Sequence, residues 1–219
     1  TKGRLTSNFS GFCDHKPEEV PVAEFNREAG SFIRLWVASM GGAKATKDTF
    51  DFVVDCGDIF NSWTLKDKIL SGDNELAEAL VPYVAKANPV RILKLDWDDR
   101  QAPDVTPQFW TELNNRIHGD VMTCCVGGHG RSGTSFVCLL LNNAPDYDAL
   151  DAIVHLRAVH CPRAIESIAQ HEYINTVAEY LGRKGNAKDA HSITDYKGAF
   201  MASKKPTAVT MRQSLGWDS

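Results

Sequence analysis

Short apolar runs alternate along this chain with longer segments in which apolar residues recur every three or four positions. The runs that predict strands cover residues 31–40, 50–56, 91–97 and 119–125. Helical spacing covers residues 74–88, 106–117, 132–143, 146–160 and 164–182. Residues 41–50 interrupt the pattern and predict a break between two strands. Strands that alternate with helices predict a single α/β domain with a mostly parallel sheet flanked by helices.

The pattern also divides the chain into three parts. Residues 31–182 carry the alternation and form the predicted domain, which ends at Gly182. Residues 1–30 are expected to be an N-terminal extension that packs on this domain or leads into it. Residues 183–219 are rich in Lys, Gly, Ser and Thr and predict a flexible tail. This tail carries a net charge of +4, whereas the rest of the chain carries −8.

Composition excludes several classes of protein. An acidic body argues against nucleic-acid binding, which depends on clustered cations. No apolar run approaches the ~18 residues that a membrane span needs, so no membrane partner is expected. Scattered cysteines with no regular spacing fit a reducing, cytoplasmic location rather than a disulfide framework. These six cysteines are Cys13, Cys56, Cys124, Cys125, Cys138 and Cys161. Paired zinc-binding motifs are missing from the sequence, so we expect no metal and no cofactor; the oligomeric state stays open.

The stretch CCVGGHGRSGT, residues 124–134, joins the last predicted strand to a predicted helix. Free N–H groups at the start of a helix and in a glycine-rich loop form a site for anions. The Arg131 guanidinium can bind two phosphate oxygens at once. The same positive surroundings would favour a thiolate at Cys125, which makes it a candidate nucleophile. Residues 125–132 therefore predict a phosphate cradle, whose phosphate-binding residues would be Val126, Gly127, Gly128, His129, Gly130 and Arg131.

The order Cys125, five residues, Arg131 and Ser132 resembles the signature of the cysteine-dependent protein tyrosine and dual-specificity phosphatases. Residues 97–103, the acid loop, resemble the Trp-Pro-Asp loop of this family, and Asp99 falls on the position of its general acid. Residues 163–170 resemble the family segment in which a glutamine orients the attacking water, a role that would fall to Glu166 or Gln170. The resemblance covers residues 31–182.

This resemblance implies a metal-independent phosphatase that acts through a phosphocysteine. Cys125 would attack phosphorus while Asp99 gives a proton to the leaving group, and Asp99 would then activate water. The Ser132 hydroxyl would hydrogen-bond the departing sulfur. The implied substrate is a phosphorylated protein or peptide, with phosphotyrosine and phosphoserine or phosphothreonine both open. The alternatives are a weak or inactive phosphate-binding module of the same fold, and a phosphatase for phosphoinositides or an RNA 5′-phosphate.

Several positions depart from the family pattern or keep two interpretations. Cys124 stands where the family usually has His, and it lies seven positions before Arg131 instead of six, so it is not the expected nucleophile. Asp98 replaces the loop proline and stays a second candidate acid. Cys56 or Cys124 could form a protective disulfide with Cys125, or both could be buried structural thiols.

Four other polar side chains have a structural interpretation, and His129 has a functional one as well. His129 either contacts the substrate or shapes the loop. His160 is assigned to its own helix rather than to the site. Arg163, more than Arg157, is expected to support the loops structurally.

Overall fold

The structure, a computed structural model, describes residues 21–27, 30–60, 91–95 and 97–203. The predicted helix over residues 74–88 and the cysteine at position 13 lie outside these ranges. Within them, no helix is both long and apolar enough to cross a membrane.

Five strands form one sheet in the order β1-β2-β5-β3-β4. Their bounds are β1 Ala23–Asn26, β2 Phe32–Ser39, β3 Phe52–Asp55, β4 Arg91–Lys94 and β5 Gly119–Cys125. Strands β2, β5, β3 and β4 are parallel, and β1 adds an antiparallel edge beside β2. The predicted single α/β domain with a mostly parallel sheet is confirmed.

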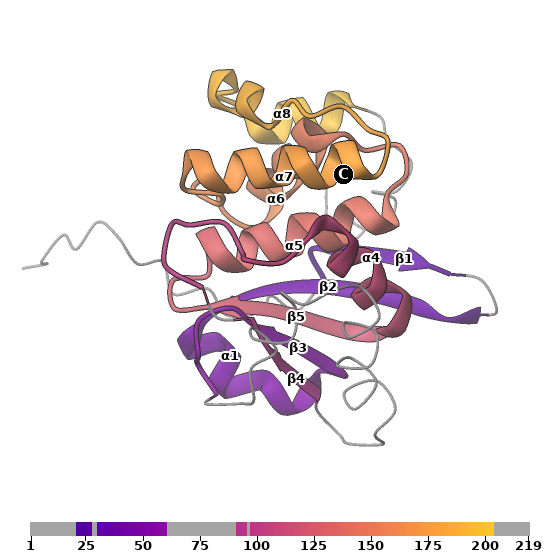
Figure 1. Cartoon of the computed structure of the whole chain (residues 1–219), viewed down its shortest axis with the longest axis vertical. Helices are drawn as coiled ribbons and strands as arrows, with labels where there is room; N and C mark the ends of the chain where they lie inside the picture. Colours follow the sequence, from indigo (N-terminus) through magenta and orange to yellow (C-terminus); the bar gives the residue numbers. More distant parts are fainter. Residues whose placement is uncertain (1–20, 28–29, 61–90, 96, 204–219) are drawn as a thin grey trace, which may run out of the picture.

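Among the described residues, helices cover both faces of the sheet (Figure 1). One face carries α4 Pro107–Arg116, α5 Gly130–Asn143, α6 Ala149–Val159 and α7 Ile168–Tyr180, and the other carries α1 Met40–Thr46. Helix α5 lies in the middle of the larger layer, and eleven of its fourteen residues are buried. Such complete burial fits the uninterrupted apolar run 136–141 that it contains.

The alternation of side chains along β5 separates two hydrophobic clusters. Val121 and Cys125 face the larger cluster beneath α5, while Met122 and Cys124 face the smaller cluster beneath α1. Successive residues of a strand point to opposite faces, so the two neighbouring cysteines lie on different sides of the sheet. Of the two cysteines, only Cys125 therefore lies on the α5 side of the sheet.

Two segments differ from the sequence predictions. Residues 41–50, expected to be a break, form most of α1 and the 3-10 helix η2 Lys47–Thr49. A helix is tolerated there because Gly42 and Ala43 are small enough to pack closely on the sheet.

The prediction of a flexible tail is wrong for residues 187–202. This segment forms the 3-10 helix η3 Ala187–Ser192 and α8 Tyr196–Ala202. Ala187 and Ala190 join the main core, and Phe200 packs against α6 residues Val154 and Ala158. At the other end, β1 belongs to the predicted N-terminal extension and pairs with β2 as part of the sheet.

Candidate active site

The carboxyl ends of the parallel strands converge where the cradle begins. Ser39 at the end of β2 pairs with Cys125, and Asp55 at the end of β3 pairs with Cys124. Cys125 is the last residue of β5, and α5 starts at Gly130 after a four-residue turn. In open α/β sheets, ligands bind at this edge.

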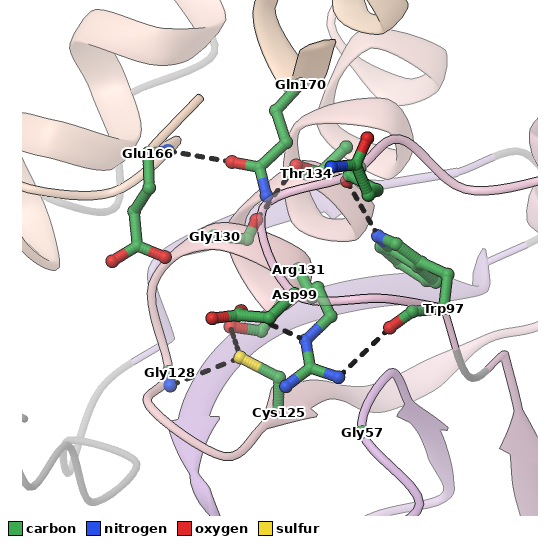
Figure 2. Close-up of polar contacts among 12 residues, drawn as sticks. Gly57, Trp97, Asp99, Cys125, Gly128, Gly130, Arg131, Thr134, Glu166 and Gln170 are labelled. Carbon is green, nitrogen blue, oxygen red and sulfur yellow. Dashed lines mark hydrogen bonds and ion pairs between the residues drawn. The ribbon is translucent and has the colours of Figure 1, made fainter. Parts of the chain in front are cut away.

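The Cys125 sulfur lies at the floor of the cradle and is directed into it (Figure 2). The Gly128 N–H donates a hydrogen bond to Sγ at 3.3 Å, and a second hydrogen bond of 3.2 Å joins Sγ to the Ser132 hydroxyl. Cys125 is only 3% exposed, so solvent contributes little to this environment. An N–H and a hydroxyl that both point at sulfur are the donors that stabilise a thiolate.

Gly128 is required by the backbone of the cradle. Its φ is +74°, and a Cβ at this position would lie 2.8 Å from the backbone nitrogen of Ser39. A residue with a side chain would therefore be strained and would push the turn away from β2. The turn is also held from outside, because His160 Nε2 donates to the Gly128 carbonyl at 2.8 Å. His160 was expected to serve its own helix, and this long-range contact had no sequence signal.

The turn after β3 supports the cradle from below. The buried Asp55 carboxylate accepts hydrogen bonds from the N–H groups of Gly57, Ile59 and Phe60 at 2.9–3.1 Å. This folds the chain so that a Cβ on Gly57 would be 3.3 Å from the Val126 nitrogen. Asp55 is thus a positioning residue that the sequence analysis missed, although a carboxylate at the end of an apolar strand was a usable signal.

Arg131 connects the cradle to the acid loop. Its Nη1 donates to the Trp97 carbonyl at 3.1 Å, and its Nε lies 3.5 Å from Oδ1 of Asp99. Trp97 is buried, and its indole N–H donates to the Gln101 carbonyl at 3.0 Å, which closes the loop on itself. Asp99 reaches Arg131 but keeps 70% of its side chain exposed. The neighbouring Asp98 is exposed as well, so it is the ion pair with Arg131 that favours Asp99 as the carboxylate at the cradle.

Glu166 and Gln170 lie against the first residue of α5. A Cβ on Gly130 would be 2.5 Å from Oε2 of Glu166 and 2.8 Å from Nε2 of Gln170. Gln170 is buried, and its Oε1 accepts the Glu166 N–H at 2.7 Å (Figure 2). Partial burial, followed by the charge of Asp99, raises the pKa of the Glu166 carboxyl above its ordinary value. The two candidates for handling water are therefore both beside the cradle.

The backbone that carries Glu166 is held by Arg157, and the expected structural support by Arg163 stays a prediction. Arg157 is buried and donates from Nε to the Ala164 carbonyl at 2.9 Å and from Nη2 to the Ile165 carbonyl at 3.1 Å. Ile165 has a φ of +62°, a conformation that side chains disfavour. These bonds help to maintain that strained residue immediately before Glu166.

The remaining cysteines of the site have distinct positions. Cys124 Sγ donates to the Val54 carbonyl at 3.6 Å on the opposite face of the sheet, so its thiol points away from the cradle. Cys56 shares the main cluster with Cys125, and a 3.1 Å hydrogen bond joins its Sγ to Ser135. Burial raises the pKa values of both Cys56 and Cys124 well above the ordinary range. A disulfide between Cys56 and Cys125 stays a prediction, and Cys124 is badly placed for that role.

His129 is 3% exposed, which favours its interpretation as a residue that shapes the loop. Its carbonyl accepts from the N–H groups of Gly133 and Ile165 at 3.2 and 3.4 Å. These contacts join the cradle both to α5 and to the segment that carries Glu166.

The donors of the cradle match an oxyanion. The Gly128 amide and the Ser132 hydroxyl contact the Cys125 sulfur, and the Arg131 guanidinium lies beside Cys125 (Figure 2). Groups of these kinds bind oxygen-rich anions such as phosphate. Within the ranges that the structure describes, no group of three or more His, Cys, Asp or Glu side chains could hold a metal ion.

Comparison with known proteins gives structural neighbours only. No family model and no curated protein matches the chain. A mutant form of Tk-PTP is 18% identical with a TM-score of 0.46, covering 72% of this chain and 96% of that one. The active form of Tk-PTP is 21% identical with a TM-score of 0.44, covering 67% of this chain and 91% of that one. A kinase-associated phosphatase whose catalytic cysteine is replaced by serine is 17% identical with a TM-score of 0.45, covering 75% of this chain and 98% of that one. At these values, the function has to be argued from the site.

Proposed function

We propose that this protein is a metal-independent phosphatase that hydrolyses phosphomonoesters on proteins through a phosphocysteine at Cys125. The observation that carries the proposal is the Cys125 sulfur at the floor of the cradle, where it accepts the Gly128 N–H and contacts the Ser132 hydroxyl. A nucleophile so placed would face phosphorus of a phosphate held by the loop.

The first step transfers the phosphoryl group to sulfur. The Cys125 thiolate attacks phosphorus, the S–P bond forms, and the bond from phosphorus to the leaving oxygen breaks. Asp99 gives its proton to that oxygen, which leaves as an alcohol or phenol, and Asp99 becomes a carboxylate. The contact between Asp99 and Arg131 supports this role because it brings the carboxyl group to the mouth of the cradle.

Arg131 stabilises the charge that spreads over the phosphate oxygens. Its Nη1 is held by the Trp97 carbonyl, so the plane of the guanidinium is fixed by the acid loop. Bound phosphate would compete with Asp99 for the Arg131 N–H groups. Asp99 would then take up a proton and give it to the leaving oxygen.

A phosphorylated protein or peptide is the substrate that the rim of the site suits best. Met40 and Val126 are both more than a third exposed, and the Met40 N–H donates to the Val126 carbonyl at 3.2 Å. They put apolar surface directly beside the cradle, where a peptide side chain could pack. We propose a cytoplasmic location, where free thiols such as Cys56 and Cys125 persist.

The test is hydrolysis of an aryl phosphate in the presence of EDTA. Wild-type protein should turn over, and Cys125→Ser should abolish the activity because a hydroxyl is a far poorer nucleophile here. Cys124→Ser is the matched control and should keep most of the rate, since that thiol faces the other side of the sheet. Turnover that survives Cys125→Ser would contradict the proposal.

A phosphate-binding module without turnover is a second candidate, favoured by one observation. Asp99 competes with phosphate for Arg131 at 3.5 Å, and a strong competition would hold the site in an unproductive state. Tight binding of vanadate by a wild-type protein that hydrolyses no aryl phosphate would support this second function.

A further inference from the structure

Two carboxyl groups, not one, stand beside the cradle. Asp99 reaches it from the acid loop through Arg131, and Glu166 reaches it from the segment before α7. A two-step phosphatase needs a proton donor for the leaving group and a proton acceptor for the attacking water. Two carboxyl groups at one site can divide these tasks when their surroundings differ.

The Glu166 carboxylate is fixed to the cradle by its own contacts. Its Oε2 lies so close to Gly130, the first residue of α5, that a Cβ there would be 2.5 Å away, and the Gly130 backbone N–H favours its charged form. Gln170 fixes the backbone on which Glu166 stands, because its Oε1 accepts the Glu166 N–H. Figure 2 shows the Glu166 carboxylate on the side of the turn where the Cys125 sulfur and Gly128 lie.

We propose, resting on the proposed function, that Glu166 is the general base that activates water to hydrolyse the phosphocysteine, while Asp99 serves as the acid of the first step. Water attacks phosphorus as Glu166 takes one of its protons, and the new P–O bond forms. The S–P bond breaks, and its electron pair returns to Cys125 as a thiolate. The products are inorganic phosphate and protonated Glu166, which then releases its proton to solvent.

The surroundings of Asp99 and Glu166 fit this division. The charged groups that act on Glu166 are Asp99 and Arg100 from the acid loop and Arg163 from its own segment. Asp99 becomes negative when it gives up its proton, and this charge increases the affinity of Glu166 for a proton. The first step therefore strengthens the base that the second step uses. Asp99 itself keeps 70% of its side chain exposed and lies 3.5 Å from Arg131, the cation that would hold the phosphate.

The decisive variant is Glu166→Gln, which keeps the shape of the side chain beside Gly130 but cannot take a proton. Rapid mixing with p-nitrophenyl phosphate should give a full burst of p-nitrophenol, followed by turnover slowed by about 10²-fold. Wild-type turnover should rise with pH through the raised pKa of Glu166, because only the carboxylate accepts a proton, and the variant should lose that rise. Glu172→Gln is the matched control, an exposed glutamate of α7 paired with Lys188, and should behave as wild type.

Other outcomes would overturn the role of Glu166. If Glu166→Gln keeps the wild-type rate and pH profile, the side chain only orients water or the loop. If it loses the burst, Glu166 acts before the phosphocysteine forms. The burst amplitude measures the concentration of active, folded enzyme. The steady-state rate divided by this amplitude is therefore independent of any unfolded fraction. A wild-type protein without Cys125-dependent turnover would instead overturn the proposed function, and this role with it.

Discussion

The cradle and the loops around it are built in opposite ways. In the cradle Cys125, Gly128 and His129 are buried, as is most of the first turn of α5, while Val126 is exposed at the rim, and backbone groups make essential contacts. Around the cradle, Asp99 and Glu166 stand on exposed segments and reach it through side chains. The part that must stabilise charge is rigid, whereas the part that must exchange protons with solvent is accessible.

This difference predicts which changes should be severe. A change in the cradle should disturb backbone geometry and therefore both binding and chemistry. A change in the surrounding loops should remove one proton-transfer step and leave the fold intact.

Gly128→Ala should have the largest effect on activity. The positive φ and the approach of a Cβ to Ser39 would move the turn, and displacement of a reacting group by about 1 Å costs ~10²-fold in rate. We expect kcat/KM for an aryl phosphate to fall by at least that factor.

Gly182→Ala is the matched control for backbone strain. Gly182 has a φ of +72°, but nothing lies within 4 Å of its added Cβ. It should lower the free energy of unfolding by ~1–2 kcal/mol and leave kcat/KM unchanged. Equal losses of activity in the two variants would show that the tight turn at Gly128 has no special role.

Asp99→Asn should lower kcat by about 10²-fold for substrates with poor leaving groups, because the proton donor is lost. The melting temperature should hardly change, since the side chain is largely exposed and its ion pair with Arg131 is screened. Asp98→Asn is the control and should keep most of the rate. A larger loss in Asp98→Asn would assign the acid to the neighbouring carboxylate.

His160→Leu should have a smaller effect, because it removes a support that reaches the Gly128 carbonyl from outside the turn. We expect kcat/KM to fall by about 10-fold, which corresponds to the ~1.4 kcal/mol of one hydrogen bond. His160→Gln can still donate a hydrogen bond and should recover part of the loss. No recovery, with an unchanged melting temperature, would mean that this bond does not position the cradle.

Replacement of the core histidine His155 should have the smallest effect on the site, because this residue should affect stability alone. Burial lowers the pKa of His155 from 6.5 to about 4. The unfolded chain therefore takes up a proton at higher pH than the folded one, and stability falls as the pH drops from 6.5 to 4. This contribution reaches ~3 kcal/mol. Urea unfolding of wild type and His155→Gln should show a weaker pH dependence in the variant; identical slopes would contradict this origin.

The sequence predicted the parts of the molecule that depend on local pattern. The strands that became β2, β3, β4 and β5 are short apolar runs bounded by polar residues, and α5 follows the glycine-rich turn. The cradle itself could be predicted because its chemistry is contained in eight consecutive residues. Asp99 and Glu166 were found only through resemblance, since nothing local marks them.

The contacts that cross the fold could not be predicted. The side chains of His160 and Arg157 donate hydrogen bonds to backbone carbonyls, those of Gly128, Ala164 and Ile165. Every residue has such a carbonyl, so the sequence does not show which one is the acceptor. Helices η3 and α8 are too short to show a helical period, and burial against α6 and α7 stabilises them. The prediction of a flexible tail failed for that reason.

The central claim is that the Cys125 sulfur carries the phosphoryl group during turnover. Acid quenching during turnover of p-nitrophenyl phosphate by Glu166→Gln, followed by peptide mass spectrometry, tests it most directly. We predict a phosphoryl adduct on the peptide that contains residues 124–131, with the modified atom assigned by fragmentation to Cys125. An adduct on Cys124 or His129, or continued turnover with no covalent adduct, would contradict the account.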